Sequence, residues 1–184
     1  MITLDHISMA FGDKQIFKDL SLVFSSPGQY AVLGSSGRGK TTLLRLIAGL
    51  EHPKSGRIIL PENLRIAYCF QEDRLLPFKT VLENVSLVCG CTDTALYWLR
   101  KVGLKGEENS YPAALSGGMK RRAALARALA FDAPVLLMDE PFRALDSDTH
   151  AAMLALVREA AKDKLLILVT HDEADAEGMQ IIRL

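Results

Sequence analysis

Residues 34–42, GSSGRGKTT, restrict the possible fold more than any other stretch of this chain. They follow a short apolar run, residues 30–34, of the kind that forms a strand buried in a parallel sheet. They open the sequence KTTLLRLIAGL, which has a helical pattern until Gly49 offers a stop. The glycine-rich stretch therefore joins a buried strand to the N-terminus of a helix, and this connection is a basic unit of α/β folds.

The same stretch predicts phosphate binding, because it matches the pattern G-x-x-x-x-G-K-[ST] between a strand and a helix. Glycines let backbone N–H groups surround phosphate oxygens, and the helix N-terminus adds partial positive charge. We expect Lys40 to reach the β- and γ-phosphates of a nucleotide and Thr41 to hold Mg²⁺ through its hydroxyl. A chance glycine turn is the alternative, but a random chain of this length would match only about once in a hundred. The candidate nucleotide-binding residues are Gly34, Ser35, Ser36, Gly37, Arg38, Gly39, Lys40, Thr41 and Thr42.

The order of the remaining patterns predicts a mostly parallel sheet with additions. Residues 133–139 and 164–171 are further buried-strand candidates, and residues 146–164 between them have a helical pattern with Asp146, Ser147 or Asp148 as its cap. Residues 2–12, 15–24, 56–60 and 64–70 read as strands, several of them antiparallel. Residues 77–130 look mostly helical. We predict a single α/β domain over residues 1–184, with an N-terminal antiparallel β subdomain and a helical insertion at about 77–130.

Two acidic residues end the apolar run VLLMDE. A buried strand would deliver the Asp139 carboxylate rigidly to a nucleotide-bound metal, as in a Walker B strand. Glu140 points in a different direction as the next residue and suits the polarisation of an attacking water. Without the glycine-rich loop, a solvated loop start would be the better interpretation of these acids.

A second glycine-containing stretch, LSGGM at residues 115–119, precedes the helical pattern KRRAALARALA. Glycines weaken helices, so their place at this helix start needs another reason. Ser116, Gly117 and Gly118 would leave backbone amides open to a phosphate. An ordinary serine cap with a flexible lead-in is the alternative interpretation.

Taken in order, these motifs resemble the nucleotide-binding subunit of an ATP-binding cassette (ABC) transporter, over nearly the whole chain. LSGGM resembles the ABC signature, with Met119 where glutamine is commonest. The resemblance implies a P-loop NTPase core, ATP and Mg²⁺ as cofactors, and a mostly parallel sheet. It also assigns further residues: Gln71 in CFQED as the glutamine that senses Mg²⁺ and the attacking water, residues 143–146 (RALD) as the D-loop, His171 as the switch histidine, and Phe11 as the aromatic that stacks on adenine.

The resemblance implies an assembly in which Glu140, His171, Gln71 and Lys40 are catalytic and Thr41, Gln71 and Asp139 bind the metal. Two cassettes, here a homodimer, would face each other head to tail, with ATP between the P-loop of one and the LSGG of the other. A separate membrane permease would receive the energy, with residues 71–78 (QEDRLLPF) forming part of its docking groove. YPAALSGGM and FQEDRLLP resemble importer cassettes, especially those for sulfonates, nitrate or taurine, so a solute-binding protein is an indirect partner.

Two other functions fit parts of the sequence. A soluble ABC ATPase that acts on nucleic acid or ribosomes would use the basic run Lys120–Arg121–Arg122, but that run fits a solvated helix face better. A P-loop kinase would leave LSGG and Glu140 unexplained. Lys plus Arg and Asp plus Glu number 22 each, so the net charge of zero argues against a generally basic nucleic-acid binder.

The bulk sequence favours a reducing compartment and no membrane span. No apolar run approaches the ~18 residues of a spanning helix, and the chain does not open like a signal peptide. Three cysteines give an odd number, as expected for free thiols. We therefore expect a soluble, intracellular protein, peripheral at the cytoplasmic face of the membrane through its permease. From the chain's length we also expect no cargo-sensing domain on this subunit.

Overall fold

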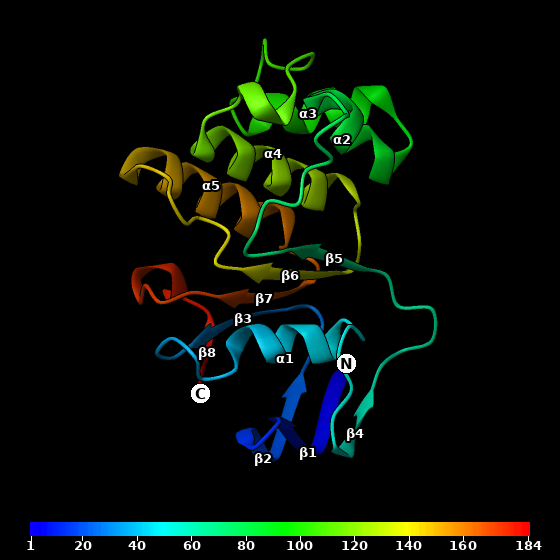
Figure 1. Ribbon diagram of the computed structural model, residues 1–184, viewed down its shortest axis with the longest axis vertical. Coiled ribbons are helices and arrows are strands. Elements are labelled where there is room, and N and C mark those ends of the chain that lie inside the picture. Colours follow the sequence, from blue (N-terminus) through cyan, green and yellow to red (C-terminus); the bar gives the residue numbers. More distant parts are fainter.

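Five parallel strands form the central sheet of the computed structural model, which describes residues 1–184. Their order is β5-β6-β7-β3-β8, and each neighbouring pair is parallel (Figure 1). The predicted α/β class and the three central apolar strands are confirmed. The strands are β3 (Gly28–Leu33), β5 (Ile66–Cys69), β6 (Val135–Asp139), β7 (Leu165–Val169) and β8 (Gln180–Arg183).

A separate antiparallel sheet contains the N-terminal strands in the order β2-β1-β4. These strands are β1 (Ile2–Phe11), β2 (Lys14–Phe24) and β4 (Ser55–Ile59). Residues 64–70, which the sequence grouped with this region, differ: their strand β5 pairs in parallel with β6 in the central sheet. Strand β8 was not predicted, because its four residues are mostly exposed and lack a buried apolar run.

Helices cover both faces of the central sheet (Figure 1). α1 lies between the two sheets, whereas α4 and α5 cover the opposite face, with α2 and α3 packed beyond α4. No helix is both long enough and apolar enough to cross a bilayer. The helices are α1 (Lys40–Ile47), α2 (Val81–Cys89), α3 (Thr92–Lys101), α4 (Gly117–Ala130) and α5 (Ser147–Ala160), with short 3₁₀ turns η1 (Pro112–Ala114) and η2 (Ala174–Ala176).

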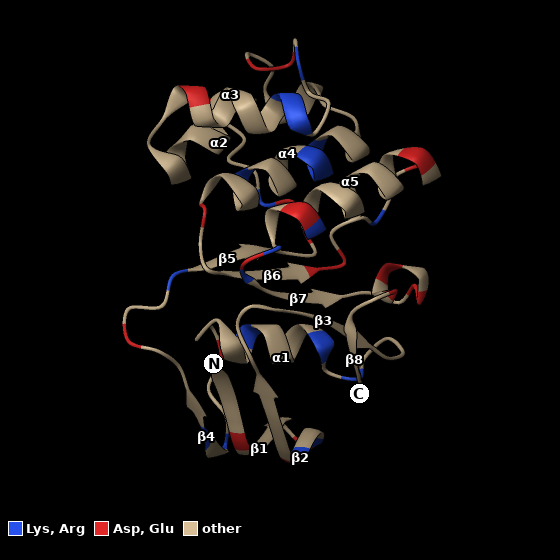
Figure 2. Ribbon diagram, turned by 180° about the vertical axis from the view of Figure 1, so that it is seen from behind, with Lys and Arg blue, Asp and Glu red and all other residues tan.

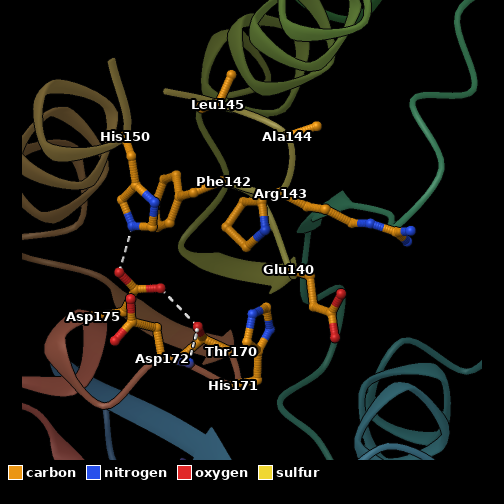
Figure 3. A pocket seen from close by; sticks show the side chains of 11 residues that line it. Glu140, Phe142, Arg143, Ala144, Leu145, His150, Thr170, His171, Asp172 and Asp175 are labelled. Carbon is orange, nitrogen blue, oxygen red and sulfur yellow. Dashed lines mark hydrogen bonds and ion pairs between the residues drawn. The ribbon is translucent and has the colours of Figure 1, made fainter. Parts of the chain in front are cut away.

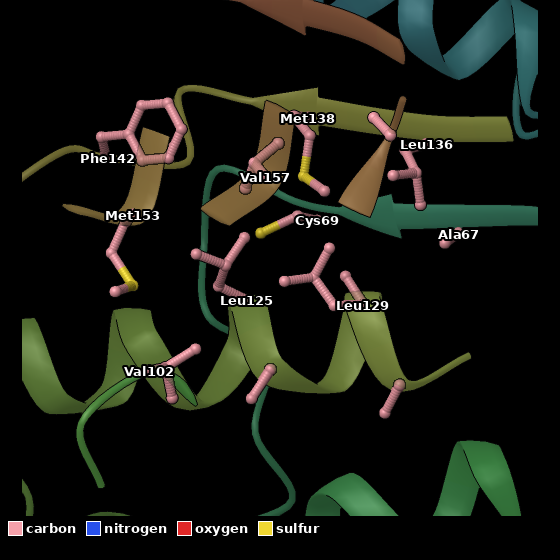
Figure 4. Close-up of a cluster of buried hydrophobic side chains, with 14 of the residues drawn as sticks. Ala67, Cys69, Val102, Leu125, Leu129, Leu136, Met138, Phe142, Met153 and Val157 are labelled. Atoms are coloured by element: carbon pink, nitrogen blue, oxygen red, sulfur yellow. The ribbon is translucent and has the colours of Figure 1, made fainter. Parts of the chain in front are cut away.

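The central sheet separates two hydrophobic cores. Because successive side chains of a strand point to opposite faces, β6 contributes Leu136 and Met138 to one core and Val135 and Leu137 to the other. The first core packs β5 and β6 against α4 and α5 (Figure 4). The second packs the sheet against α1 and the antiparallel sheet. This arrangement holds the carboxyl ends of the parallel strands rigidly at one edge, where ligands bind in open α/β sheets.

Candidate functional site

The glycine-rich loop places Lys40 at its centre. The Lys40 ammonium is largely buried and donates hydrogen bonds to the carbonyl oxygens of Gly34 (2.6 Å) and Ser35 (3.1 Å). Gly39 caps α1 with a φ of 94°, and a Cβ there would lie 2.5 Å from Cγ2 of Ile16. A side chain at Gly39 would therefore be strained and would also clash with β2, so glycine is required for this loop conformation.

Thr41 and Asp139 meet at the carboxyl edge of the sheet. The Thr41 hydroxyl donates to Oδ1 of Asp139 at 3.2 Å, although the two residues are far apart in the sequence. Burial raises the pKa of Asp139, the Thr41 hydrogen bond opposes this shift, and the neighbouring Glu140 adds to it. The strand thus holds a desolvated carboxylate beside the first turn of α1.

Glu140 follows Asp139 but leaves the strand direction. Its backbone is left-handed, with φ of 47°, and its N–H donates to the carbonyl of Val169 at 2.9 Å. Its Oε2 accepts a hydrogen bond from Nε2 of Gln71 at 3.4 Å. A positive φ is uncommon outside glycine, so this backbone turn directs the Glu140 side chain away from the Asp139 side chain and toward Gln71.

His171 lines the same cavity as Glu140, at the end of β7 (Figure 3). The cavity has a volume of about 390 Å³ and is also bordered by the loop at residues 141–145. The structure therefore gathers Lys40, Thr41, Gln71, Asp139, Glu140 and His171 at one edge of the sheet. These residues come from four separate segments of the chain.

The other expected nucleotide contacts lie apart from this cluster. Ser116 caps α4 and accepts the Met119 N–H at 3.3 Å; in the first turn Gly117 is exposed and Gly118 is half-buried. Gly117 has open space where a Cβ would be, and a Cβ on Gly118 would meet only Leu145 and Ala144. Phe11 ends β1 and is 47% exposed. Within one chain, none of these residues is hydrogen-bonded to the glycine-rich loop.

Arg121 corrects the interpretation of residues 120–122 as a solvated helix face. Its guanidinium is buried and donates to the backbone carbonyls of Phe70, Gln71, Asp139, Glu140 and Pro141 at 2.6–3.2 Å. It also contacts the Asp73 carboxylate at 3.4 Å. This one side chain therefore joins α4 to both segments that carry Gln71 and Glu140. The sequence does contain a signal for the burial of Arg121: at helical spacing, Ala124, Leu125 and Ala128 lie on the same face of α4, and that face is apolar.

Comparisons with known proteins agree with this geometry. A family model described as "ABC transporter" matches residues 17–143. The aliphatic sulfonates import ATP-binding protein SsuB 1 of Shouchella clausii is 41% identical over 95% of this chain and 72% of its own length. SsuB of Granulibacter bethesdensis is 44% identical over 96% and 75%, and SsuB 1 of Burkholderia cenocepacia is 42% identical over 98% and 60%. The chain thus spans between 60% and 75% of the length of these relatives.

Solved structures match over the whole chain. The dimeric structure of MJ0796, a bacterial ABC transporter cassette, superposes with a TM-score of 0.91 at 30% identity and covers 100% of this chain and 94% of its own. A post-hydrolysis state of the same cassette, bound to ADP and Pi, gives a TM-score of 0.91 at 29% identity over the same shares of both chains.

Proposed function

The chain belongs to the ABC transporter family of ATPases, and on that premise we propose that it is the ATP-hydrolysing subunit of an importer. The observation that carries this proposal is the convergence of Lys40, Asp139, Glu140 and Gln71 beside the glycine-rich loop. A phosphate-binding loop alone would suit many nucleotide-binding proteins. An acid turned toward a glutamine amide, beside a second acid at the strand end, suits hydrolysis of a terminal phosphate.

Lys40 would exchange its carbonyl partners for phosphate oxygens when ATP binds. Its ammonium already lies at the centre of the loop, so binding requires a short movement rather than refolding. Backbone N–H groups of residues 34–42 and the N-terminus of α1 would complete the anion site. Phe11, exposed at the end of β1, is available to stack on the adenine.

The donor atoms near Asp139 fit Mg²⁺, which prefers oxygen ligands and usually keeps phosphates and waters among them. Thr41, Asp139 and Gln71 would hold it together with phosphate oxygens. The protein alone offers no group of three or more His, Cys, Asp or Glu side chains that could hold a metal ion. When bound, the ion would neutralise charge on the phosphates. Glu140 would orient the attacking water and accept its proton, with Gln71 and His171 around the γ-phosphate.

The exposed LSGG turn supports a head-to-tail dimer. Ser116 and Gly117 expose the N-terminus of the 14-residue helix α4 to solvent, and no hydrogen bond joins residues 116–118 to the glycine-rich loop of the same chain. A second copy of the chain would supply the nucleotide that this turn contacts. The matching MJ0796 cassette is described as dimeric, which supports the same arrangement here.

An apolar groove supports docking of a membrane permease. It has a volume of about 450 Å³ and lies between the end of α1, β5, α2 and α4. Leu76, from the stretch expected to meet the permease, lines it, and Leu87 beside it is 61% exposed. Such a groove suits an apolar helix of a partner protein. Its further lining residues include Leu50, Ile66, Tyr68, Phe70, Val88 and Phe131.

The relatives' names indicate the cargo class. We infer small sulfonates as the transported solutes, delivered to the permease by a solute-binding protein, and a peripheral position of this subunit at the cytoplasmic face of the membrane. Action on nucleic acid is disfavoured, because Lys plus Arg and Asp plus Glu number 22 each and blue and red segments are interspersed along the ribbon in Figure 2. Arg121, which belongs to the one clustered basic run, is buried.

Paired measurements of nucleotide affinity and steady-state hydrolysis test the proposal. Lys40→Ala should abolish turnover and weaken ATP binding, because the fixed charge on the β- and γ-phosphates is lost. Glu140→Gln should retain binding while turnover falls by about 10²- to 10⁴-fold, the usual contribution of a general base. Near-parental hydrolysis by Glu140→Gln would mean that another group accepts the proton. Membrane recovery of the chain with and without a co-expressed permease tests the transport role.

A further inference from the structure

We propose that Asp175 and His150 are positioning residues for His171, and that they fix the backbone on both sides of it. This inference rests on the proposed role of His171 at the γ-phosphate. Neither residue belongs to a motif described above, and both border the cavity that contains Glu140 and His171 (Figure 3).

Asp175 is the centre of the arrangement. It lies in η2 with only 3% of its surface exposed, and each of its carboxylate oxygens has one side-chain partner. Oδ1 lies 2.5 Å from Nε2 of His150, and Oδ2 accepts a hydrogen bond from the Thr170 hydroxyl at 2.6 Å. Because a buried carboxylate is costly unless paired, these two contacts fix its orientation.

Thr170 transmits this constraint to the residues that flank His171. Its hydroxyl donates to Asp175 and accepts the N–H of Asp172 at 3.1 Å. Its own N–H donates to the carbonyl of Val32 in β3 at 3.4 Å. The residues directly before and after His171 are therefore both tied to one hydroxyl, which in turn is tied to a buried carboxylate.

The His171 ring itself has no such support. It is exposed, and no dashed line in Figure 3 ends on it. Its direction therefore depends on the backbone that carries it. A ring that must meet a phosphate within hydrogen-bond range is sensitive to small displacements, so the Asp175 network would affect turnover more than binding.

His150 connects this network to the other side of the cavity. It lies in the first turn of α5, whose cap is Asp146 at the end of the 143–146 loop. Its ring packs on the buried Phe142 ring, with centroids 5.0 Å apart. Phe142 is two residues after Glu140, the proposed base. Because His150 contacts both Phe142 and Asp175, it fixes the distance between the segment that carries Glu140 and the segment that carries His171.

A double-mutant cycle tests whether Asp175 and His150 act through His171. Asp175→Asn and His150→Gln should each lower kcat about tenfold and leave nucleotide affinity within about twofold. In a His171→Ala background, the same substitutions should cause no further loss of kcat. If they lower kcat by the same factor in both backgrounds, their effect is independent of His171 and the proposal is wrong.

Two measurements keep the test interpretable. Thermal unfolding identifies a variant that fails to fold. If Asp175→Asn fails to fold, the cycle of His150→Gln with His171→Ala tests the proposal by itself. Glu173→Gln is the matched control, because this residue lies in the same segment with a side chain 74% exposed and paired only with Arg183; its kcat should equal that of the parent. If His171→Ala alone leaves kcat unchanged, the proposed function of His171 fails, an outcome separate from failure of the cycle.

Discussion

The Asp139 carboxylate ends a strand buried on both faces, and burial raises its pKa above that of the unfolded chain. A carboxyl group with a raised pKa contributes stability that is complete below its unfolded pKa and is lost as the pH rises through the folded value. At neutral pH the charged side chain therefore lowers the stability of the nucleotide-free protein. Asp139→Asn should raise that stability by on the order of 1 kcal/mol and weaken Mg²⁺-dependent nucleotide binding.

Thermal unfolding with and without Mg²⁺ and ADP measures both effects. The parent should gain more stability from Mg-ADP than the variant, although the variant alone unfolds at the higher temperature. Thr41 can still donate to the remaining amide oxygen, so its hydrogen bond is kept. A variant that is less stable than the parent without nucleotide would contradict the argument from burial.

At the scale of elements, Arg121 holds α4 against the segments after β5 and β6. Lysine has one compact donor group and cannot reproduce the fork that reaches carbonyls on both segments. Arg121→Lys should therefore lower the free energy of unfolding by about 2–4 kcal/mol, because buried carbonyls lose their partners. Denaturant titration measures the change. Arg122→Lys is the control: its guanidinium contacts Val102 and Gly103 near the surface, and it should cost less than about 1 kcal/mol.

At the scale of the whole molecule, ATP should bring two copies together. Glu140→Gln should be mostly monomeric alone and dimeric with Mg-ATP, because the shared nucleotides supply much of the contact. Adding Gly117→Glu should prevent dimerisation, since the new carboxylate repels the partner's phosphate while the fold has open space for it. Light scattering on the single and double variants decides. An unchanged mass with Mg-ATP, even with the permease supplied, would contradict the head-to-tail assembly.

Local patterns predicted the parts of this molecule that depend on neighbours in the sequence. The strand before Gly34, the α1 helix after it and the strand ending at Asp139 each carry their signal within a few residues, and the structure contains all three. Of the three candidate caps, Asp146 is the one that caps α5, accepting the Thr149 N–H at 3.0 Å. The meeting of Lys40, Thr41 and Asp139 could be anticipated because a known motif implies it.

Contacts between distant segments could not be anticipated in the same way. Arg121 has an acceptor in Phe70 51 residues earlier and another in Pro141 20 residues later, and a basic run gives no sign of either. His150 and Asp175 are 25 residues apart, so no local pattern relates one to the other. The parallel pairing of β5 depends on where the chain returns to the sheet, whereas alternation along a strand reveals only which face is buried.

The central sheet, with a hydrophobic core on each face, also determines which backbone amide hydrogens exchange most slowly with solvent. Every residue of β6 and β7 is buried, and both strands have neighbours on either side. Their amide hydrogens should exchange with solvent deuterium only when the whole domain opens, whereas the mostly exposed β4 and β8 should exchange through local fluctuations. The two central strands, which end at Asp139 and shortly before His171, would then contain the slowest-exchanging amides of the protein.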